Sequence, residues 1–129
     1  MTIAIVFIIG RVIFGLYWLQ VAYNHFKHSA MLAGYAQSKG VKSSKAAVIG
    51  SGVLALLGGL SVILGFYPRV GLTLLALFLL GVSVKMHAFW KEADPQAKQA
   101  DKIQFHKNTA IFAAILMLFT LALPWVWSI

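Results

Sequence analysis

Residues 3–24 read IAIVFIIGRVIFGLYWLQVAYN, an apolar run in which Arg11 is the one charged residue. A helix needs about 20 predominantly apolar residues to cross the ~30 Å hydrocarbon core of a bilayer. The run has this length and therefore predicts a membrane-spanning helix. A charged side chain at such depth costs at least ~2.5 kcal/mol unless it is solvated or paired. The partner of Arg11 is therefore the first question that the sequence raises.

The rest of the chain is equally apolar. It has 129 residues, of which 60% are hydrophobic and 11% charged, and its mean hydropathy is +0.84. Soluble domains are about half apolar and about a quarter charged. Three further stretches have the length of a membrane span. We therefore expect an all-α integral-membrane bundle of four helices, in a single domain over residues 1–129. The expected spans are about 3–24, 46–67, 70–90 and 109–128.

The first two connections between these stretches predict local structures. The segment SAMLAGYAQS, residues 29–38, consists mostly of helix formers and is followed by Gly40, a residue typical of the position after a helix end. We expect a short helix there, lying at the membrane interface. The segment FYPRVG, residues 66–71, is too short for anything but an antiparallel hairpin of the two flanking helices.

The third connection and the C-terminus carry two further signals. All three acidic residues of the chain lie in the connection 91–108. We expect this connection to be ordered, with Asp94 and Asp101 paired with nearby lysines or histidines. Near the C-terminus, the segment PWVW contains two tryptophans, which are typical of the membrane interface. We expect Trp125 and Trp127 to anchor the chain there.

The net charge of +8 is concentrated on one side of the predicted bundle. The first and third connections lie on that side and carry Lys27, Lys39, Lys42, Lys45, Lys91, Lys98, Lys102 and Lys107, whereas the other side carries Arg69 alone. Because lysine-rich loops stay in the cytoplasm, we expect a multi-pass protein of a bacterial inner membrane with both termini outside the cytoplasm. Lysines placed between spans face the lipid bilayer surface and argue against a nucleic-acid partner. The chain has no cysteine, which excludes disulfides and thiolate metal sites.

Small residues repeat along the second apolar stretch, where they allow helix backbones to approach closely. The candidate helix-packing residues are Ser51, Ala55, Gly58, Gly59 and Gly65. Two alternatives remain open. The small residues pack against helices of the same bundle, or they pack against a protein partner or a second copy of the chain.

Polar and aromatic residues gather on one face of three predicted helices, as a rotation of 100° per residue shows. The candidate ligand-binding residues are Arg11, Trp18 and His25 on the first helix, His87 and Trp90 on the third, and Asn108 on the fourth. Arg11 bonds either backbone carbonyls and water or an acceptor that a ligand brings. His87 is a proton carrier, a haem or metal ligand, or a hydrogen-bonded structural residue.

No pattern in the sequence demands catalysis. The four histidines have no carboxylate or thiol at ligand spacing, so we expect no metal site. The chain contains no EXXH pair, no nucleophile–base–acid set and no phosphate-binding loop. Catalytic residues are therefore unknown, and an enzyme that acts alone is not indicated.

Five segments follow one another along the chain: RVIFGLYWLQVAYNHF, LAGYAQSKGV, LLGGLSVILGF, HAFW and FHKN. In this order they resemble the DoxX family of small bacterial membrane proteins. Arg11 and Gly15 match the family motif Arg-x3-Gly-x2-Phe-x3-Gly-x-x-Lys. Trp18, Ala22 and His25 stand in for its Phe, second Gly and Lys. HAFW and FHKN are similar to pieces of one branch of the family.

The resemblance implies a four-helix membrane fold and a role beside a partner. The family includes a subunit of thiosulfate:quinone oxidoreductase, members linked with redox or oxidative-stress partners, and distant eukaryotic cargo receptors and receptor chaperones. We therefore expect an accessory or quinone-interacting subunit of a membrane redox system. The alternatives are a non-catalytic membrane chaperone or assembly factor and, third, a small transporter. One departure is Ala55, where many relatives have a glutamate that would pair with Arg11.

Overall fold

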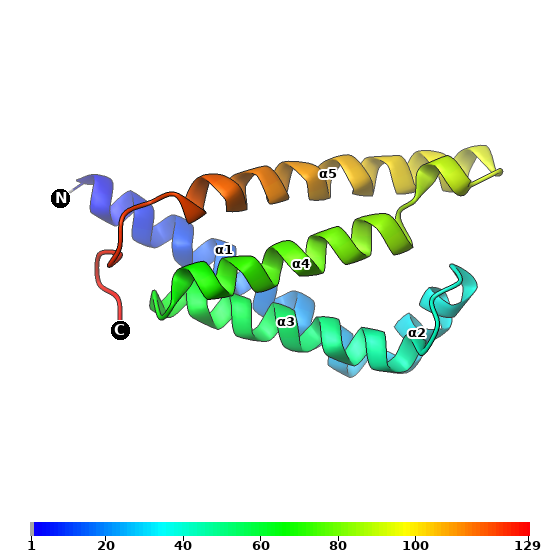
Figure 1. Cartoon of the computed structure of the whole chain (residues 1–129), viewed down its shortest axis with the longest axis horizontal. Helices are drawn as coiled ribbons and strands as arrows, with labels where there is room; N and C mark the ends of the chain where they lie inside the picture. Colours follow the sequence, from blue (N-terminus) through cyan, green and yellow to red (C-terminus); the bar gives the residue numbers. More distant parts are fainter. Residues whose placement is uncertain (1) are drawn as a thin grey trace.

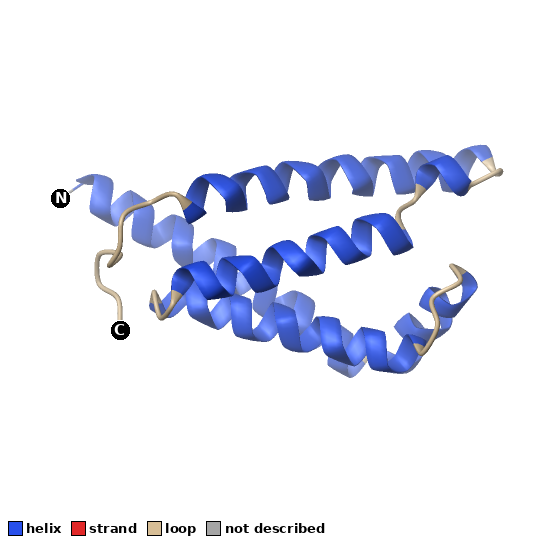
Figure 2. Ribbon diagram, in the orientation of Figure 1, coloured by secondary structure: helices blue, strands red, loops and turns tan. Residues whose placement is uncertain are grey.

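The computed structural model describes residues 2–129, which form helices and no strand. The elements are α1 (Thr2–Lys27), α2 (Ser29–Ser38), α3 (Ser44–Leu64), α4 (Pro68–Met86), the short 3-10 helix η1 (Phe89–Lys91) and α5 (Pro95–Phe119). The four long helices run alternately up and down (Figure 1), and loops are short (Figure 2). One end of the bundle holds both chain termini and is called the terminal end. The other holds α2, η1 and the start of α5 and is called the lysine-rich end.

Helix α3 is central to the packing. It contacts α1, α4 and α2, whereas α5 packs mainly against α4 and η1. The five largest side chains that are less than 2% exposed are Trp18, Val62, Leu72, Leu75 and Ile115. They come from α1, α3, α4 and α5, so the four long helices share one hydrophobic core.

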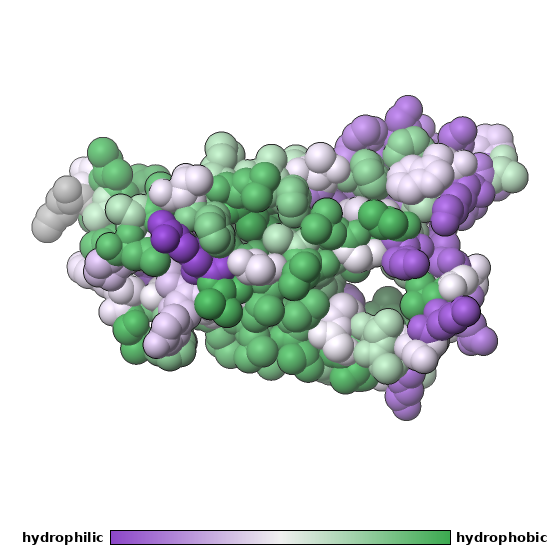
Figure 3. All heavy atoms as spheres, in the orientation of Figure 1, coloured by the Kyte–Doolittle hydropathy of each residue, from purple (hydrophilic) through white to green (hydrophobic). Residues whose placement is uncertain are grey.

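Three of the described helical segments are long and apolar enough to cross a membrane. They are Thr2–Lys27, Ser44–Leu64 and Pro68–Lys91. Figure 3 shows hydrophobic atoms over the middle of the molecule and hydrophilic atoms gathered at the lysine-rich end. An apolar surface of this extent in contact with water is rare in soluble monomers. The protein is therefore a membrane protein that associates with a lipid bilayer.

Helix α5 differs from the predicted fourth span, 109–128, at both ends. It begins at Pro95 because the Asp94 side chain caps it, accepting a hydrogen bond from the Ala97 amide at 2.9 Å, and because proline suits the first helical turn. The predicted connection 91–108 is therefore ordered, largely as helix. Asp94 caps the helix and has no lysine or histidine partner among residues 2–129.

The C-terminal segment, residues 120–129, is not helical. It folds back over the terminal end of the bundle, as Figure 1 shows. Trp125 is 4% exposed and packs edge-to-face on Phe7, so the prediction that it anchors at the interface is wrong. Trp127 is 79% exposed, as an interfacial residue would be.

The helix predicted over residues 29–38 and the hairpin predicted over residues 66–71 are confirmed. Helix α2 covers residues 29–38, and Gly40 has the positive φ of 84° that ends it. The turn between α3 and α4 is a tight hairpin in which Gly65 and Tyr67 adopt φ of 68° and 47°. Glycine takes such angles without steric cost.

Two small residues of α3, Gly58 and Gly59, lie against neighbouring helices of the same chain. A Cβ on Gly59 would meet the Gly15 carbonyl of α1 at 3.0 Å, and one on Gly58 would lie 2.5 Å from Leu75 of α4. Ala55 is fully buried beside them. Close approach of α3 to both α1 and α4 thus uses these positions inside the bundle.

Candidate functional site

Arg11 lies at the terminal end and bonds backbone carbonyls. Its guanidinium donates to the carbonyl oxygens of Val62 and Ile63 in the last turn of α3, at 3.1 and 2.9 Å. It also donates to the carbonyls of Val126 and Trp127 in the C-terminal segment. Four of the five N–H groups of a guanidinium therefore have partners within the chain, and the residue is 5% exposed.

These bonds satisfy acceptors that the fold would otherwise leave open. The last four carbonyls of a helix have no partner in the helix, and a cation there also interacts favourably with the helix dipole. The rings of Phe7 and Trp125 lie 5.6 and 5.7 Å from the guanidinium carbon. Arg69 acts similarly at the end of α5, donating to the Phe119 carbonyl at 3.0 Å. Of the two alternatives for Arg11, the geometry favours the carbonyls.

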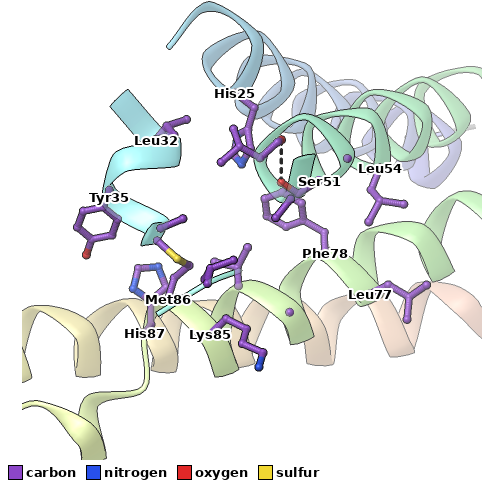
Figure 4. Close-up of a pocket in the computed structure, with 17 residues that line it drawn as sticks. His25, Leu32, Tyr35, Ser51, Leu54, Leu77, Phe78, Lys85, Met86 and His87 are labelled. Atoms are coloured by element: carbon purple, nitrogen blue, oxygen red, sulfur yellow. Dashed lines mark hydrogen bonds between the residues drawn. The ribbon is translucent and has the colours of Figure 1, made fainter. Parts of the chain in front are cut away.

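A cavity of about 540 Å³ lies near the lysine-rich end, between α2, α3 and α4. Most of its wall is aliphatic or aromatic and includes Leu54, Leu77 and Phe78. Figure 4 shows Leu32 and Tyr35 of α2 across from the α3 and α4 side chains. The ammonium of Lys85, which also lines the cavity, points away from the other lining residues in this view. An apolar cavity with few polar groups is typical of a site for a small organic ligand.

Two of the predicted residues, His25 and His87, both line this cavity. His25 reaches it from α1, and its Nδ1 lies 2.9 Å from the Val21 carbonyl. His87 follows the last residue of α4, and its Nδ1 lies 3.2 Å from Asp101 Oδ1 of α5. In each ring Nε2 has no hydrogen-bond partner among residues 2–129. The cavity is thus apolar with two imidazole nitrogens free to bond a ligand.

An ion-pair cluster, Lys39, Glu92, Asp101 and His87, borders the cavity at the lysine-rich end. Lys39 Nζ lies 2.7 Å from Glu92 Oε1 and 2.6 Å from Asp101 Oδ2. Asp101 is 4% exposed, and the prediction that it pairs with a lysine or histidine is confirmed. The cluster joins α2 to η1 and α5.

The environment of this cluster keeps its charges in place. Burial alone would raise the pKa of Asp101, but the hydrogen bonds from Lys39 and His87 outweigh burial and lower that pKa. Burial alone would lower the pKa of Lys39, but the hydrogen bonds to Asp101 and Glu92 raise it. Both groups are therefore charged at neutral pH. In the described part of the chain, no group of three histidine, cysteine or acidic residues could hold a metal ion.

A second cavity, of about 660 Å³, lies between α2 and α5. It shares Leu32, Tyr35 and His87 with the first cavity and is also lined by Asp101 and Gln104. Figure 3 shows an opening in the surface toward the lysine-rich end. The two cavities therefore adjoin at His87.

The other predicted residues lie away from the cavities. Trp18 is 1% exposed and packs edge-to-face on Phe78, one layer behind the first cavity. Its indole N–H has no hydrogen-bond partner among the described residues. Trp90 is 51% exposed and packs on Phe105. Asn108 is buried on α5 and lines neither cavity.

Sequence reasoning missed the contribution of α2 to this site. Leu32 and Tyr35 resemble residues of an interfacial helix, because an apolar side chain facing a cavity has the same pattern as one facing lipid. Lys39 was one lysine among eight in the loops. The three acids in the third connection were the signal that a lysine partner exists, but nothing local in the sequence shows which of the eight loop lysines it is.

Comparison with known proteins agrees with the sequence motifs. The DoxX family model matches residues 6–88, a range that contains α2, α3 and both cavity histidines. A search of curated proteins and a search of solved structures found no match. The matched range comprises 83 of 129 residues, counted from 6 to 88 inclusive, which is more than half of the chain. The chain therefore belongs to the DoxX family of membrane proteins.

Proposed function

We propose that this DoxX protein is an accessory subunit of a membrane redox system and that it binds a quinone, in its oxidised or reduced form, in the first cavity. The observation that supports this proposal is an apolar cavity lined by two histidines, each with Nε2 unpartnered among residues 2–129. A quinone has an apolar ring and chain and two oxygens at the ring edge. Aliphatic walls suit the apolar ring and chain, and imidazole nitrogens suit the oxygens.

Calorimetric titration tests the proposal. The protein is placed in phosphatidylcholine nanodiscs and titrated with decylubiquinone and with decylubiquinol, and empty nanodiscs correct for partition into lipid. His87→Phe and His25→Phe should each weaken the tighter of the two complexes about two- to tenfold, since a net hydrogen bond contributes about 0.5–1.5 kcal/mol. His28→Phe, at an exposed histidine outside both cavities, should leave affinity unchanged. Equal affinities in all four proteins would exclude this site.

The proposal includes a fourth span and an orientation. The apolar part of α5 is short for a span, but the C-terminal segment extends it, and irregular backbone is tolerated at membrane depth where protein satisfies its polar groups. The lysines of the first and third connections would then lie in the cytoplasm of a bacterial cell and both termini outside. An alkaline phosphatase fused after Ile129 should be active. Activity only of a cytoplasmic reporter at that position would reverse the orientation.

The alternatives of a membrane chaperone or a small transporter have less support. Gly58 and Gly59, two of the small residues that suggested a surface for another membrane protein, lie against α4 and α1. A transporter would need a titratable carboxylate within the spans, and the three acids of the chain lie outside them.

A further inference from the structure

The hydrogen positions on the two cavity histidines follow from their partners. A carbonyl oxygen only accepts hydrogen bonds, so Nδ1 of His25 carries the hydrogen that bonds Val21. An ionised carboxylate also only accepts, so Nδ1 of His87 carries the hydrogen that bonds Asp101. A neutral imidazole has one N–H. In both neutral rings Nε2 is therefore an acceptor.

The junction of the two cavities is consequently rich in acceptors. The Asp101 carboxylate accepts, as does His87 Nε2 in the neutral ring, while Tyr35 and Gln104 can both donate and accept. The charge of Lys39 is shared by two carboxylates at 2.6 and 2.7 Å, so the ion-pair cluster has a net charge of −1 when His87 is neutral. No lysine or arginine among the described residues lines the second cavity.

We infer that this junction selects an uncharged amphiphile through hydroxyl groups on its head, with the head beside His87, Asp101 and Gln104 and the apolar chain in the first cavity. For the proposed quinone ligand, this is the reduced quinol. The inference rests on the proposed function in so far as both require the first cavity to bind an apolar chain.

A carbonyl head and an anionic head each match the acceptors of the junction less well than a hydroxyl head does. A quinol hydroxyl donates to an imidazole nitrogen or a carboxylate, whereas a quinone carbonyl leaves those acceptors unpaired. An anionic head would face Asp101, whose partner Lys39 is shared with Glu92, and like charges placed together are strongly unfavourable. We expect decylubiquinol to bind about tenfold more tightly than decylubiquinone, as two hydrogen bonds would give. Dodecanol should bind at least about tenfold more tightly than dodecanoate of equal chain length.

A charge change at Gln104 tests where the head lies. In the same nanodiscs, Gln104→Lys should raise the affinity for dodecanoate relative to dodecanol at least about tenfold, because the new ammonium would pair with the carboxylate. Gln99→Lys is the matched control, since Gln99 is an exposed residue of α5 that lines neither cavity. It adds the same charge and should change neither affinity. A shift of equal size in both variants would overturn the assigned position of the head.

Photo-crosslinking locates the two ends of the amphiphile directly. A dodecanol analogue with a diazirine beside the hydroxyl should label the tryptic peptides 28–39, 86–91, 99–102 and 103–107. An analogue with the diazirine at the chain end should label peptides 46–69 and 70–85. The reverse labelling pattern, or equal affinities for quinol and quinone, would overturn the inference. In that case the proposed function still stands if quinone binding depends on His87. Selective dodecanol binding at the predicted peptides without binding of either quinone form supports the inference and refutes the proposed function.

Discussion

Arg11→Met tests whether this arginine holds the C-terminal segment. The change removes every donor and leaves four carbonyls behind, of which the Val62 carbonyl makes a buried hydrogen bond and the other three make partly buried ones. A buried acceptor left without a partner costs about 1–3 kcal/mol. Water can reach the partly buried carbonyls, so each of these costs less. The two cation–π contacts add roughly 0.5–1 kcal/mol each.

One term opposes this loss. Methionine removes a charge from an apolar site, and replacing buried ionic groups with apolar ones is often neutral or favourable when both partners are replaced. Here the partners are backbone carbonyls that no side-chain substitution removes. We therefore expect Arg11→Met to lower the free energy of unfolding by about 2–4 kcal/mol. This is the summed cost of the unpaired carbonyls, reduced by the desolvation cost of the buried charge that the variant no longer has.

The assay is unfolding in dodecylmaltoside micelles by titration with dodecyl sulfate, followed by helical circular dichroism. Amide exchange adds a local measurement, since the Ile129 amide donates to the Leu64 carbonyl at 2.9 Å and should lose protection when the C-terminal segment is released. Arg69→Met is the matched control: it removes an exposed arginine that also donates to helix-end carbonyls, and water can replace it. It should cost less than about 1 kcal/mol.

The opposite outcome is equally clear. A free energy of unfolding within ~0.5 kcal/mol of the parent, with unchanged exchange at residues 126–129, would show that Arg11 does not hold the segment. Loss of ligand binding in such a stable variant would instead assign Arg11 to the ligand.

Two further predictions concern the ion-pair cluster and the helix contacts. Because the pKa of Asp101 is lowered, this residue should stabilise the fold fully above about pH 4, the ordinary range of an aspartate pKa. This stability should be lost as the pH falls through the lowered pKa. Unfolding measured from pH 2 to 7 should show the loss in the parent and not in Asp101→Asn. Gly58→Ala places a Cβ 2.5 Å from Leu75 and 3.0 Å from the Gly71 carbonyl and should cost about 1–3 kcal/mol by overpacking. Gly10→Ala has no atom within 4 Å of the new Cβ, and a loss of stability in that variant equal to the loss in Gly58→Ala would refute the steric explanation.

The buried face of α1 could be predicted from the sequence because helical periodicity fixes it. Arg11, Gly15, Trp18 and Ala22 fall on one line at 100° per residue, and they are the buried residues of α1. Local signals also sufficed for α2, where helix formers end at a glycine. In both cases residues close in sequence determine the structure.

The C-terminal segment could not be predicted in this way. Residues 109–128 are apolar throughout apart from a few small polar residues, and composition does not distinguish a helix from a segment packed against the bundle. The segment is bonded by Arg11, which lies more than 110 residues away in the sequence. The candidate site depends likewise on the position of α2 beside α4 and α5, which no local pattern encodes.

The distribution of the two kinds of cation agrees with these different tasks. The chain has nine lysines and two arginines, and both arginines donate to carbonyls at helix ends, Arg11 beside α3 and Arg69 beside α5. Lysine is a compact, strongly hydrated charge that suits a wet surface, whereas the guanidinium offers five donors in a fixed plane and is more weakly hydrated. A helix that must donate hydrogen bonds to four carbonyls at one point therefore requires an arginine, and a lysine could not replace it. The arginine in the first apolar run thus bonds carbonyls of both α3 and the C-terminal segment, whose last ten residues are not helical.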